Sequence, residues 1–292
     1  MTVELNAQEF FMENSKKLKI VSHLRCIKCS HILESVENQW VCTHCSRHYP
    51  VIDGIPDFVL EDTPYQPRSV DLHEKYENFG GHTSRKNNFS NTWRKKKILE
   101  LVEGEIILEI GMAEGWLTSD LVQRAETVVS CDIAMSYLRR ARDAGIKAAL
   151  FRADAHQLPF ENTMFDCVVL TEVLEHVFSP VRVLEEIRRV LKPAGVLVLS
   201  APNNLSVSNI LRHIFKKESQ DQDMHFSFFD PFSLRQLLRL TGFDCLTLET
   251  TFYYWPLIKW LFYSGWIQGI FRALNPYFGD KILVKARKQG AV

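Results

Sequence analysis

Three features common in other protein classes are missing from this sequence of 292 residues. It has no charge excess, because 35 basic residues balance 35 acidic ones, so no global field attracts a polyanion, although a local basic patch is compatible with this balance. Residues 1–17 have no basic segment leading into an apolar core, which disfavours a signal peptide. The aromatic stretch at residues 252–278 is interrupted by Lys259, Arg272 and two glycines, which argues against a transmembrane span.

One glycine is missing from a turn that otherwise has the pattern of a nucleotide site. Residues 106–110 form an apolar run too short for a helix, which predicts a strand buried on both faces. A turn of small residues follows, then a helix over residues 116–124, a second strand over residues 127–131, and Asp132. Strand, glycine turn, helix, strand and terminal carboxylate are the plan of a βαβ nucleotide site.

The missing glycine indicates which nucleotide fits. A dinucleotide fingerprint requires GxGxxG, but here Trp116 occupies the third position and Ala113 the middle one. The bulky indole argues against NAD and FAD. S-adenosylmethionine (SAM) has no phosphate to hold, and it needs close backbone beside its methionine part and a carboxylate for its ribose hydroxyls. The small turn at residues 111–115 and Asp132 suit that ligand.

The seven cysteines do not have the spacing of a secreted disulfide scaffold, and four of them form two CxxC pairs. Twelve residues separate the pair Cys26 and Cys29 from the pair Cys42 and Cys45. Two such knuckles can close a tetrahedral site of four thiolates around Zn²⁺, with no position open for catalysis. We interpret them as a structural zinc site in a reducing cytosol; a redox CxxC is the alternative.

The end of this cysteine-containing module, Tyr49-Pro-Val-Ile-Asp-Gly-Ile-Pro-Asp-Phe58, carries a family resemblance. It resembles the close of the zinc ribbons typified by small activator proteins of tRNA methyltransferases, and related ribbons occur fused ahead of methyltransferase domains. The resemblance implies a zinc-ribbon domain over residues 20–60 and is specific for fold, not for partner. Residues 61–92 turn polar, and we expect them to form a linker that becomes part of a lid.

Beyond Asp132, predicted strands continue to alternate with predicted helices. Five more strands are expected, at residues 146–151, 165–170, 196–200, 243–250 and 281–286. Helices are expected over residues 133–144, after Ser179-Pro180 and after Asp230-Pro231. Seven strands interleaved with helices predict an α/β fold with a doubly wound, Rossmann-like sheet, and ligands at the carboxyl ends of its strands.

Six segments in this order resemble the class I SAM-dependent methyltransferases: LEIGMAEG, VSCDIAMSYLRRAR, ADAHQLPF, FDCVVLTEVLEHV, LKPAGVLVLSAPN and HFSFFDPFSLRQLLRLTGF. The closest branch is the one containing the quinone-biosynthesis enzymes and many glycan and polyketide methyltransferases. The resemblance spans roughly residues 90–290. It implies a methyltransferase domain over residues 93–290, with a seven-stranded sheet whose last strand is antiparallel.

The same resemblance implies roles for particular residues. The implied cofactor-binding residues are Glu109, Gly111, Ala113, Gly115, Asp132, Asp154, Ala155 and Thr171. The first four would wrap the methionine and ribose side of SAM, and Asp132 would hold the ribose hydroxyls. Asp154 and the Ala155 amide would meet the adenine edge, and Thr171 would lie beneath the sulfonium. Ala113 departs from the family's usual glycine, and its methyl group could crowd the cofactor.

Methyl transfer requires little covalent help from a protein. The sulfonium is already activated, so aligning the acceptor in a dry pocket supplies most of the rate. A general base is needed only if the acceptor loses a proton at attack. The catalytic candidates are His176, which follows the fourth strand, and His225, with His156 also considered; a structural role is the alternative for His176.

The aromatic insertion at residues 252–278 has three interpretations. Its second half is amphipathic, with Trp266 and Ile270 on one side and Arg272 on the other. It could be a helical cover or substrate lid, a dimer face, or an interfacial helix in peripheral contact with a membrane.

Together these patterns predict a cytoplasmic SAM-dependent methyltransferase with a zinc ribbon at its N-terminal side. The predicted acceptor is a small molecule, a lipid-linked intermediate or a glycan, and a nucleic acid is disfavoured. Two alternatives stay open: an RNA or translation-factor methyltransferase steered by the ribbon, and a non-catalytic SAM-binding scaffold. Trp116 argues against a third, a nicotinamide enzyme.

Overall fold

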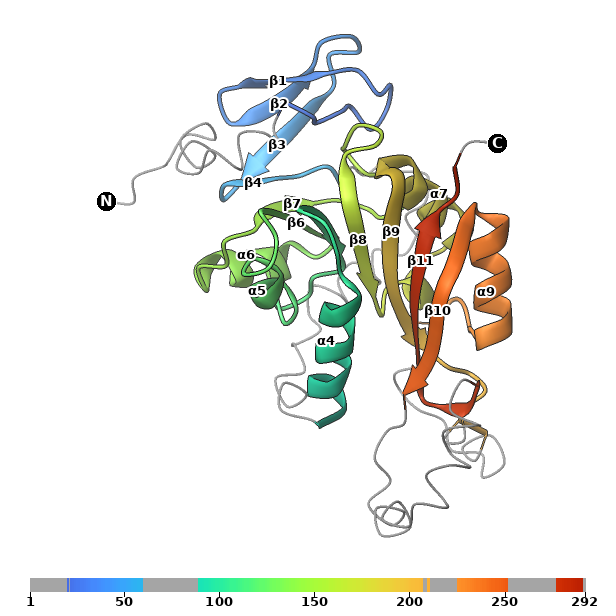
Figure 1. Cartoon of the computed structure of the whole chain (residues 1–292). Helices are drawn as coiled ribbons and strands as arrows, with labels where there is room; N and C mark the ends of the chain where they lie inside the picture. Colours follow the sequence, from blue (N-terminus) through green and yellow to red (C-terminus); the bar gives the residue numbers. More distant parts are fainter. Residues whose placement is uncertain are drawn as a thin grey trace, which may run out of the picture.

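The computed structural model describes residues 20, 22–59, 89–206, 209–210, 225–251 and 277–290 (Figure 1). These residues form a small four-stranded sheet and a seven-stranded sheet. The predicted lid at residues 61–92 and the aromatic insertion at residues 252–278 lie outside the described residues, except for their last few positions. The predicted domain boundaries, which fall at or near these segments, stay predictions.

The large sheet has the strand order β10-β11-β9-β8-β5-β6-β7. Its strands are β5 (Ile106–Ile110), β6 (Thr127–Asp132), β7 (Ala149–Arg152), β8 (Phe165–Thr171), β9 (Leu191–Pro202), β10 (Phe243–Thr251) and β11 (Lys281–Lys288). The ladders from β9 to β7 are parallel, whereas β11 runs antiparallel to both of its neighbours. The doubly wound sheet with one antiparallel strand at the end of the chain is therefore confirmed.

Of the five α-helices in the described ranges, three lie where the sequence predicts, one is shorter than predicted, and the first was not predicted. They are α4 (Phe89–Leu101), α5 (Thr118–Leu121), α6 (Met135–Asp143), α7 (Pro180–Val190) and α9 (Pro231–Leu240). The helix expected over residues 116–124 is only α5, because the amides of Gln123 and Arg124 bond three residues back and tighten the chain into turns. No helix in the described ranges is long and apolar enough to cross a bilayer.

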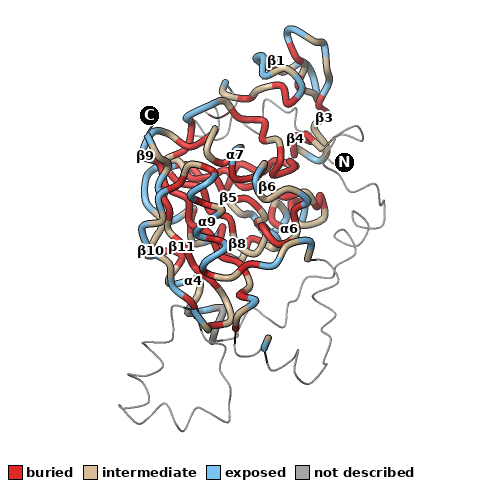
Figure 2. Tube along the Cα trace, turned by 90° about the vertical axis from the view of Figure 1, so that its right-hand side faces the viewer, coloured by how far each residue is buried: buried red, intermediate tan, exposed pale blue. Residues whose placement is uncertain are grey.

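Side-chain caps define the starts of two helices. The Ser179 hydroxyl accepts a hydrogen bond from Arg182 N at the start of α7. The Asp230 carboxylate and Ser233 form a reciprocal capping box at the start of α9, so orphan amide groups there are paired. Buried residues are concentrated in the strands of the large sheet, which the helices cover (Figure 2). The sheet edge where the ligand is expected is thus held by a rigid core.

The small sheet packs on one edge of the large one (Figure 1). It contains β1 (Leu33–Val36), β2 (Gln39–Cys42), β3 (His48–Ile52) and β4 (Ile55–Pro56). Asp57 forms a parallel bridge with Arg152 of β7, and Phe58 N donates to Arg152 O at 2.8 Å. The contact covers the edge strand β7, which would otherwise present unpaired backbone groups.

The two sheets also share one hydrophobic core. The ring of Phe58 lies 4.8 Å from Tyr49 in the small sheet and 6.4 Å from Phe151 in β7, measured between centroids. Phe151 in turn meets Phe160 edge to face at 5.4 Å. All four side chains are buried. The cysteine-containing module is therefore packed as part of the same body as the large sheet.

Candidate functional site

The turn after β5 is held in a conformation that glycine adopts readily. Gly111 and Gly115 have φ angles of +75° and +70°. A Cβ atom on Gly111 would collide with the side chain of Val173, and one on Gly115 with that of Ile146. Ala113 also lies in the left-handed region, at +46°, where a side chain costs free energy. Backbone is thus brought close to the sheet edge at this turn.

Asp132 ties the glycine turn to the end of β6. Its Oδ2 accepts a hydrogen bond from Ala113 N at 2.8 Å, and its Oδ1 accepts one from Ala134 N at 3.0 Å. The carboxylate is almost completely buried. The structure therefore brings together two features that the sequence predicts for one ligand, the tight turn and the strand-end carboxylate.

Glu109 lies behind this turn, within the protein. Its Oε2 accepts hydrogen bonds from Thr118 Oγ1 at 2.6 Å and Ser130 Oγ at 2.9 Å. Burial raises the pKa of Glu109 to about 7, although both hydroxyl groups oppose the rise. The side chain joins β5, β6 and the start of α5, so the structure gives it a positioning role; direct contact with a ligand stays a prediction.

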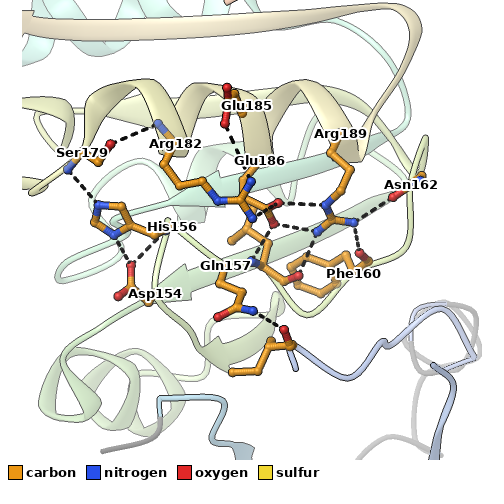
Figure 3. A network of polar contacts seen from close by, with 12 residues as sticks. Asp154, His156, Gln157, Phe160, Asn162, Ser179, Arg182, Glu185, Glu186 and Arg189 are labelled. Carbon is orange, nitrogen blue, oxygen red and sulfur yellow. Dashed lines mark hydrogen bonds and ion pairs between the residues drawn. The ribbon is translucent and has the colours of Figure 1, made fainter. Parts of the chain in front are cut away.

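The loop after β7 is shaped by a histidine whose two nitrogens are both bonded (Figure 3). Asp154 Oδ1 accepts hydrogen bonds from His156 N at 2.9 Å and His156 Nδ1 at 2.6 Å. His156 Nε2 accepts one from Ser179 N at 3.1 Å, so the ring proton is on Nδ1. His156 is buried, which favours a positioning role for it over a general base. Asp154 and Ala155 lie at the same edge as Asp132, since Ala153 N donates to Asp132 O at 3.1 Å.

The same loop is fastened to α7 and to the small sheet's module (Figure 3). Glu186, buried on α7, accepts hydrogen bonds from Leu158 N at 3.0 Å and from Arg189 Nη2 at 2.8 Å. On the opposite side, Gln157 Nε2 donates to Ile27 O, inside the first CxxC knuckle. Nothing in the sequence spacing indicates this contact, which links the cysteines to the predicted adenine loop.

The loop after β8 brings the two predicted catalytic histidines together. The rings of His176 and His225 lie 4.7 Å apart between centroids, at 72° to each other. Glu175 O accepts hydrogen bonds from Phe226 N at 2.8 Å and Ser227 N at 3.2 Å, which fasten the second histidine's segment to this loop. Thr171 is the last residue of β8 and is half-buried. Val173, in the same loop, is the residue that closely faces Gly111, so the histidines lie near the glycine turn.

Two acids that the sequence analysis did not single out lie in the same loop. Burial, then the nearby charge of Glu172, raises the pKa of Glu175 to about 8. Burial also opposes ionisation of Glu172, but Lys281 and Arg94 outweigh it and lower its pKa to about 2. Arg94 Nη1 lies 3.3 Å from Glu172 Oε1, and Lys281 also forms an ion pair with Glu172. The signal that could have found them is the spacing Glu-x-x-Glu-His over residues 172–176.

Arg94 also connects this loop to α4. Its guanidinium lies over the Trp116 ring, 5.1 Å from the ring centroid, and Lys95 lies over the same ring at 5.7 Å. The indole that replaces the third glycine of a dinucleotide motif is therefore a platform for two cations.

The four CxxC cysteines converge at one point of the small sheet's module. Cys26 Sγ lies 3.6 Å from Cys45 Sγ, and Cys29 Sγ lies 3.4 Å from Cys42 Sγ. Four thiolates at 2.3 Å from a tetrahedral Zn²⁺ lie about 3.8 Å apart, so this arrangement fits the ion closely. The amides of His44 and Cys45 point at Cys42 Sγ, at 3.5 and 3.4 Å, as donors to a thiolate.

Comparison with known proteins agrees with this geometry. Residues 108–199, from β5 into β9, match the methyltransferase domain family. The ubiquinone biosynthesis O-methyltransferase of Roseobacter denitrificans is 30% identical over 154 residues, which are 50% of this chain and 62% of that protein. The demethylmenaquinone methyltransferase of Clavibacter sepedonicus is 37% identical over 101 residues, 34% of this chain and 41% of that protein. The chain thus spans less than two thirds of the length of these relatives.

Solved structures share the fold. A SAM-dependent methyltransferase from Thermotoga maritima matches with a TM-score of 0.54 and 18% identity, over 69% of this chain and 90% of that one. A cyclase matches with a TM-score of 0.51 and 18% identity, over 68% of this chain and 81% of that one. The sheet order and the family match agree: residues 108–199 resemble the methyltransferase domain family, within a sheet that has the fold of these solved structures.

Proposed function

We propose that this chain transfers a methyl group from SAM to a hydroxyl-bearing acceptor that is a small molecule, a lipid-linked intermediate or a glycan. The observation that carries the proposal is the buried Asp132 carboxylate, bonded to Ala113 N at the glycine turn. The hydroxyl group is supported by the relative named a ubiquinone biosynthesis O-methyltransferase, and a quinone-like small molecule also by the one named a demethylmenaquinone methyltransferase.

The residues on the β5–β7 side of the sheet edge account for binding. Bound SAM supplies a methyl group already activated on a sulfonium, so the protein has mainly to position it. The Gly111 and Gly115 turn offers backbone without side-chain obstruction, and Asp132 offers a fixed carboxylate for the ribose hydroxyls. Glu109 holds the turn from behind, and Asp154 and His156 keep the adenine loop in place.

The residues after β8 are placed to act on the acceptor. An imidazole of His176 or His225 can take the proton of a hydroxyl group as its oxygen attacks the methyl carbon. Arg94 and Lys281 neutralise Glu172 beside this position, so that it does not add an uncompensated charge. These roles are part of the proposal.

We also propose that Cys26, Cys29, Cys42 and Cys45 hold a structural Zn²⁺. The bound ion would complete a module whose own core is small, and whose first knuckle is engaged by Gln157. This use of the module as support for the methyltransferase domain favours a small acceptor over an RNA or protein steered by the ribbon.

Calorimetry with SAM followed by methyl transfer tests the proposal. Tritium-labelled SAM is incubated with the full chain and a cell extract separated into lipid, small-molecule, glycan, RNA and protein pools. We expect SAM binding and label in the lipid, small-molecule or glycan pool. Label in RNA or protein alone would overturn the acceptor class; SAM binding without transfer to any pool would indicate the scaffold, and no SAM binding would overturn the proposal entirely.

A further inference from the structure

The loop after β8 contains a buried carboxyl oxygen with no partner in the part of the chain that the structure describes. Glu175 is 2% exposed, and its Oε2 has no hydrogen bond from any described residue. Buried polar atoms in folded proteins nearly always have a partner, and each exception calls for an explanation such as a bound ion. The oxygen therefore points to a ligand that completes the site.

Two imidazoles lie beside this carboxyl group. One ligand atom from each of Glu175, His176 and His225 lies within 4.8 Å of the other two. His176 Nε2 is 3.9 Å from Glu175 Oε1. Ligands at 2.1 Å from one ion lie no more than about 4.2 Å apart, so small side-chain rotations would bring all three onto a single ion.

The backbone keeps these three residues in place. Glu175 and His176 are neighbours in the short 3-10 helix η2 (Leu174–His176). His225, far away in the sequence, is fastened to them through the bonds from Phe226 N and Ser227 N to Glu175 O. A site whose ligands are pre-positioned by the fold is what binding a cation requires.

We propose that Glu175, His176 and His225 bind a divalent first-row transition cation, such as Mn²⁺, Fe²⁺, Co²⁺ or Zn²⁺. Imidazole nitrogens favour these ions over Mg²⁺ and Ca²⁺, which prefer oxygen ligands throughout. Three protein ligands leave coordination positions open, unlike the closed shell of four thiolates in the small sheet's module. The site is thus suited to chemistry, and the cysteine site to structure.

The role of the cation rests on the proposed function. An open position would hold the hydroxyl oxygen of the acceptor and lower its pKa, so that its proton leaves to water. The oxygen then forms the bond to the methyl carbon as the carbon–sulfur bond breaks, and the sulfonium becomes a neutral thioether. With the cation bound, this route replaces the imidazole base of the proposed function: His176 and His225 hold the ion, and the acceptor's proton leaves to water. A chain that binds no Mn²⁺ retains the imidazole base.

Titration with Mn²⁺, followed by electron paramagnetic resonance, tests the site. The full chain is first loaded with Zn²⁺ and dialysed against a weak chelator, because thiolates retain Zn²⁺ and bind Mn²⁺ poorly. We expect one Mn²⁺ per chain, and at least ten-fold weaker binding in His225→Ala and Glu175→Gln. The control His48→Ala, an exposed histidine on β3, should bind like the wild type.

Two results would overturn the site: no Mn²⁺ bound by the wild-type chain, or equal affinity in His225→Ala. If Glu175→Gln fails to fold, the His225→Ala variant alone tests the cation site, because His225 is half-buried and its replacement should leave the fold intact. Calorimetry with SAM on the same samples separates the claims. SAM binding without Mn²⁺ binding overturns the cation site only, and Mn²⁺ binding without SAM binding overturns the proposed function only.

Discussion

The two halves of the sheet edge differ in how their polar groups are paired. On the β5–β7 side, Asp132, Asp154 and His156 are buried and bonded to neighbouring protein groups. On the β8 side, Glu175 is equally buried but has an oxygen without a partner among the described residues, beside two histidines. The polar groups of the first half are thus bonded within the protein, and the second half contains an oxygen whose missing partner we attribute to the proposed cation.

This difference shows that buried polar groups can either stabilise the fold or be available to a ligand. Bonded polar groups lower the free energy of the folded state and hold a binding surface in one shape. An unpaired buried group raises that free energy until a ligand supplies the missing contact. Substitutions on the two halves should therefore separate stability from ligand binding.

Replacing Asp132 should cause the largest change. Asp132→Ala removes the carboxylate that bonds Ala113 N and is placed for the ribose hydroxyls, and charged hydrogen bonds contribute about 1.5–3 kcal/mol each. We expect SAM affinity to fall about 1,000-fold, or about 4 kcal/mol, by calorimetry. Asp143→Ala, an exposed acid on α6, is the control, and unchanged affinity in Asp132→Ala would contradict the proposed site.

The next largest effect is a pH dependence set by Glu109. Its pKa is about 7 in the folded chain, raised by burial from the ordinary value of 4.5, so the folded state binds an extra proton between these pH values. The stabilisation is complete below pH 4.5 and is lost as pH rises through 7, and it amounts to about 3 kcal/mol. Urea unfolding at pH 5, 6, 7 and 8 should show this decline.

Glu109→Gln removes the titrating group and should flatten that curve. The variant retains an oxygen that can accept from Thr118 and Ser130. Equal slopes in wild type and variant would show that another group causes the decline.

Two histidine substitutions compare the halves directly. His156→Ala removes the side-chain bonds to the buried Asp154 and to Ser179 N, while the backbone bond from residue 156 to Asp154 remains, so we expect a loss of about 2–3 kcal/mol in the free energy of unfolding. His225→Ala should cost less than about 1 kcal/mol, since the residue is half-buried. Chemical denaturation of both variants measures the two losses in the free energy of unfolding. Equal losses would contradict the prediction that the two halves of the sheet edge differ.

Removal of the ion from the four cysteines should have the smallest effect on ligand binding. Ile27 O accepts from Gln157, so a loosened knuckle frees one side of the adenine loop. We expect SAM affinity to fall about ten-fold, or about 1.4 kcal/mol, while Mn²⁺ binding at Glu175 persists. Gln157→Ala, which breaks only that contact, should reduce SAM affinity by less. Unchanged SAM affinity after chelation would show that the cysteine module does not support the SAM site.

The fold was predictable because its signals are local. The apolar run at residues 106–110, the glycine turn and the caps at Ser179 and Asp230 each specify an element through nearby residues alone. Alternation of such elements leaves few topologies and predicted a doubly wound sheet, whereas the strand order itself came from the structure. The length of α5 was missed because three-residue and four-residue hydrogen bonds differ too little for sequence periodicity to separate them.

The site was predictable only in part. Asp132 and Ala113 of the turn lie 19 residues apart and belong to one βαβ unit, so their meeting follows from the order of elements. The contact of Gln157 with Ile27 joins residues 130 positions apart, and the ion pair of Lys281 with Glu172 joins residues 109 positions apart. No spacing rule predicts such pairs.

The amino-acid sequence by itself determined the alternation of strands and helices, the glycine turn with its acid, and the two cysteine knuckles. Each depends on periodicity or on ligand spacing within a few tens of residues. Only the tertiary structure decided that Glu175 is buried with an oxygen that no described residue bonds, that His225 lies beside His176, and that the cysteine module covers β7. Burial and pairing are properties of surfaces brought together by packing, and residues distant in the chain acquire them only when the whole core has formed.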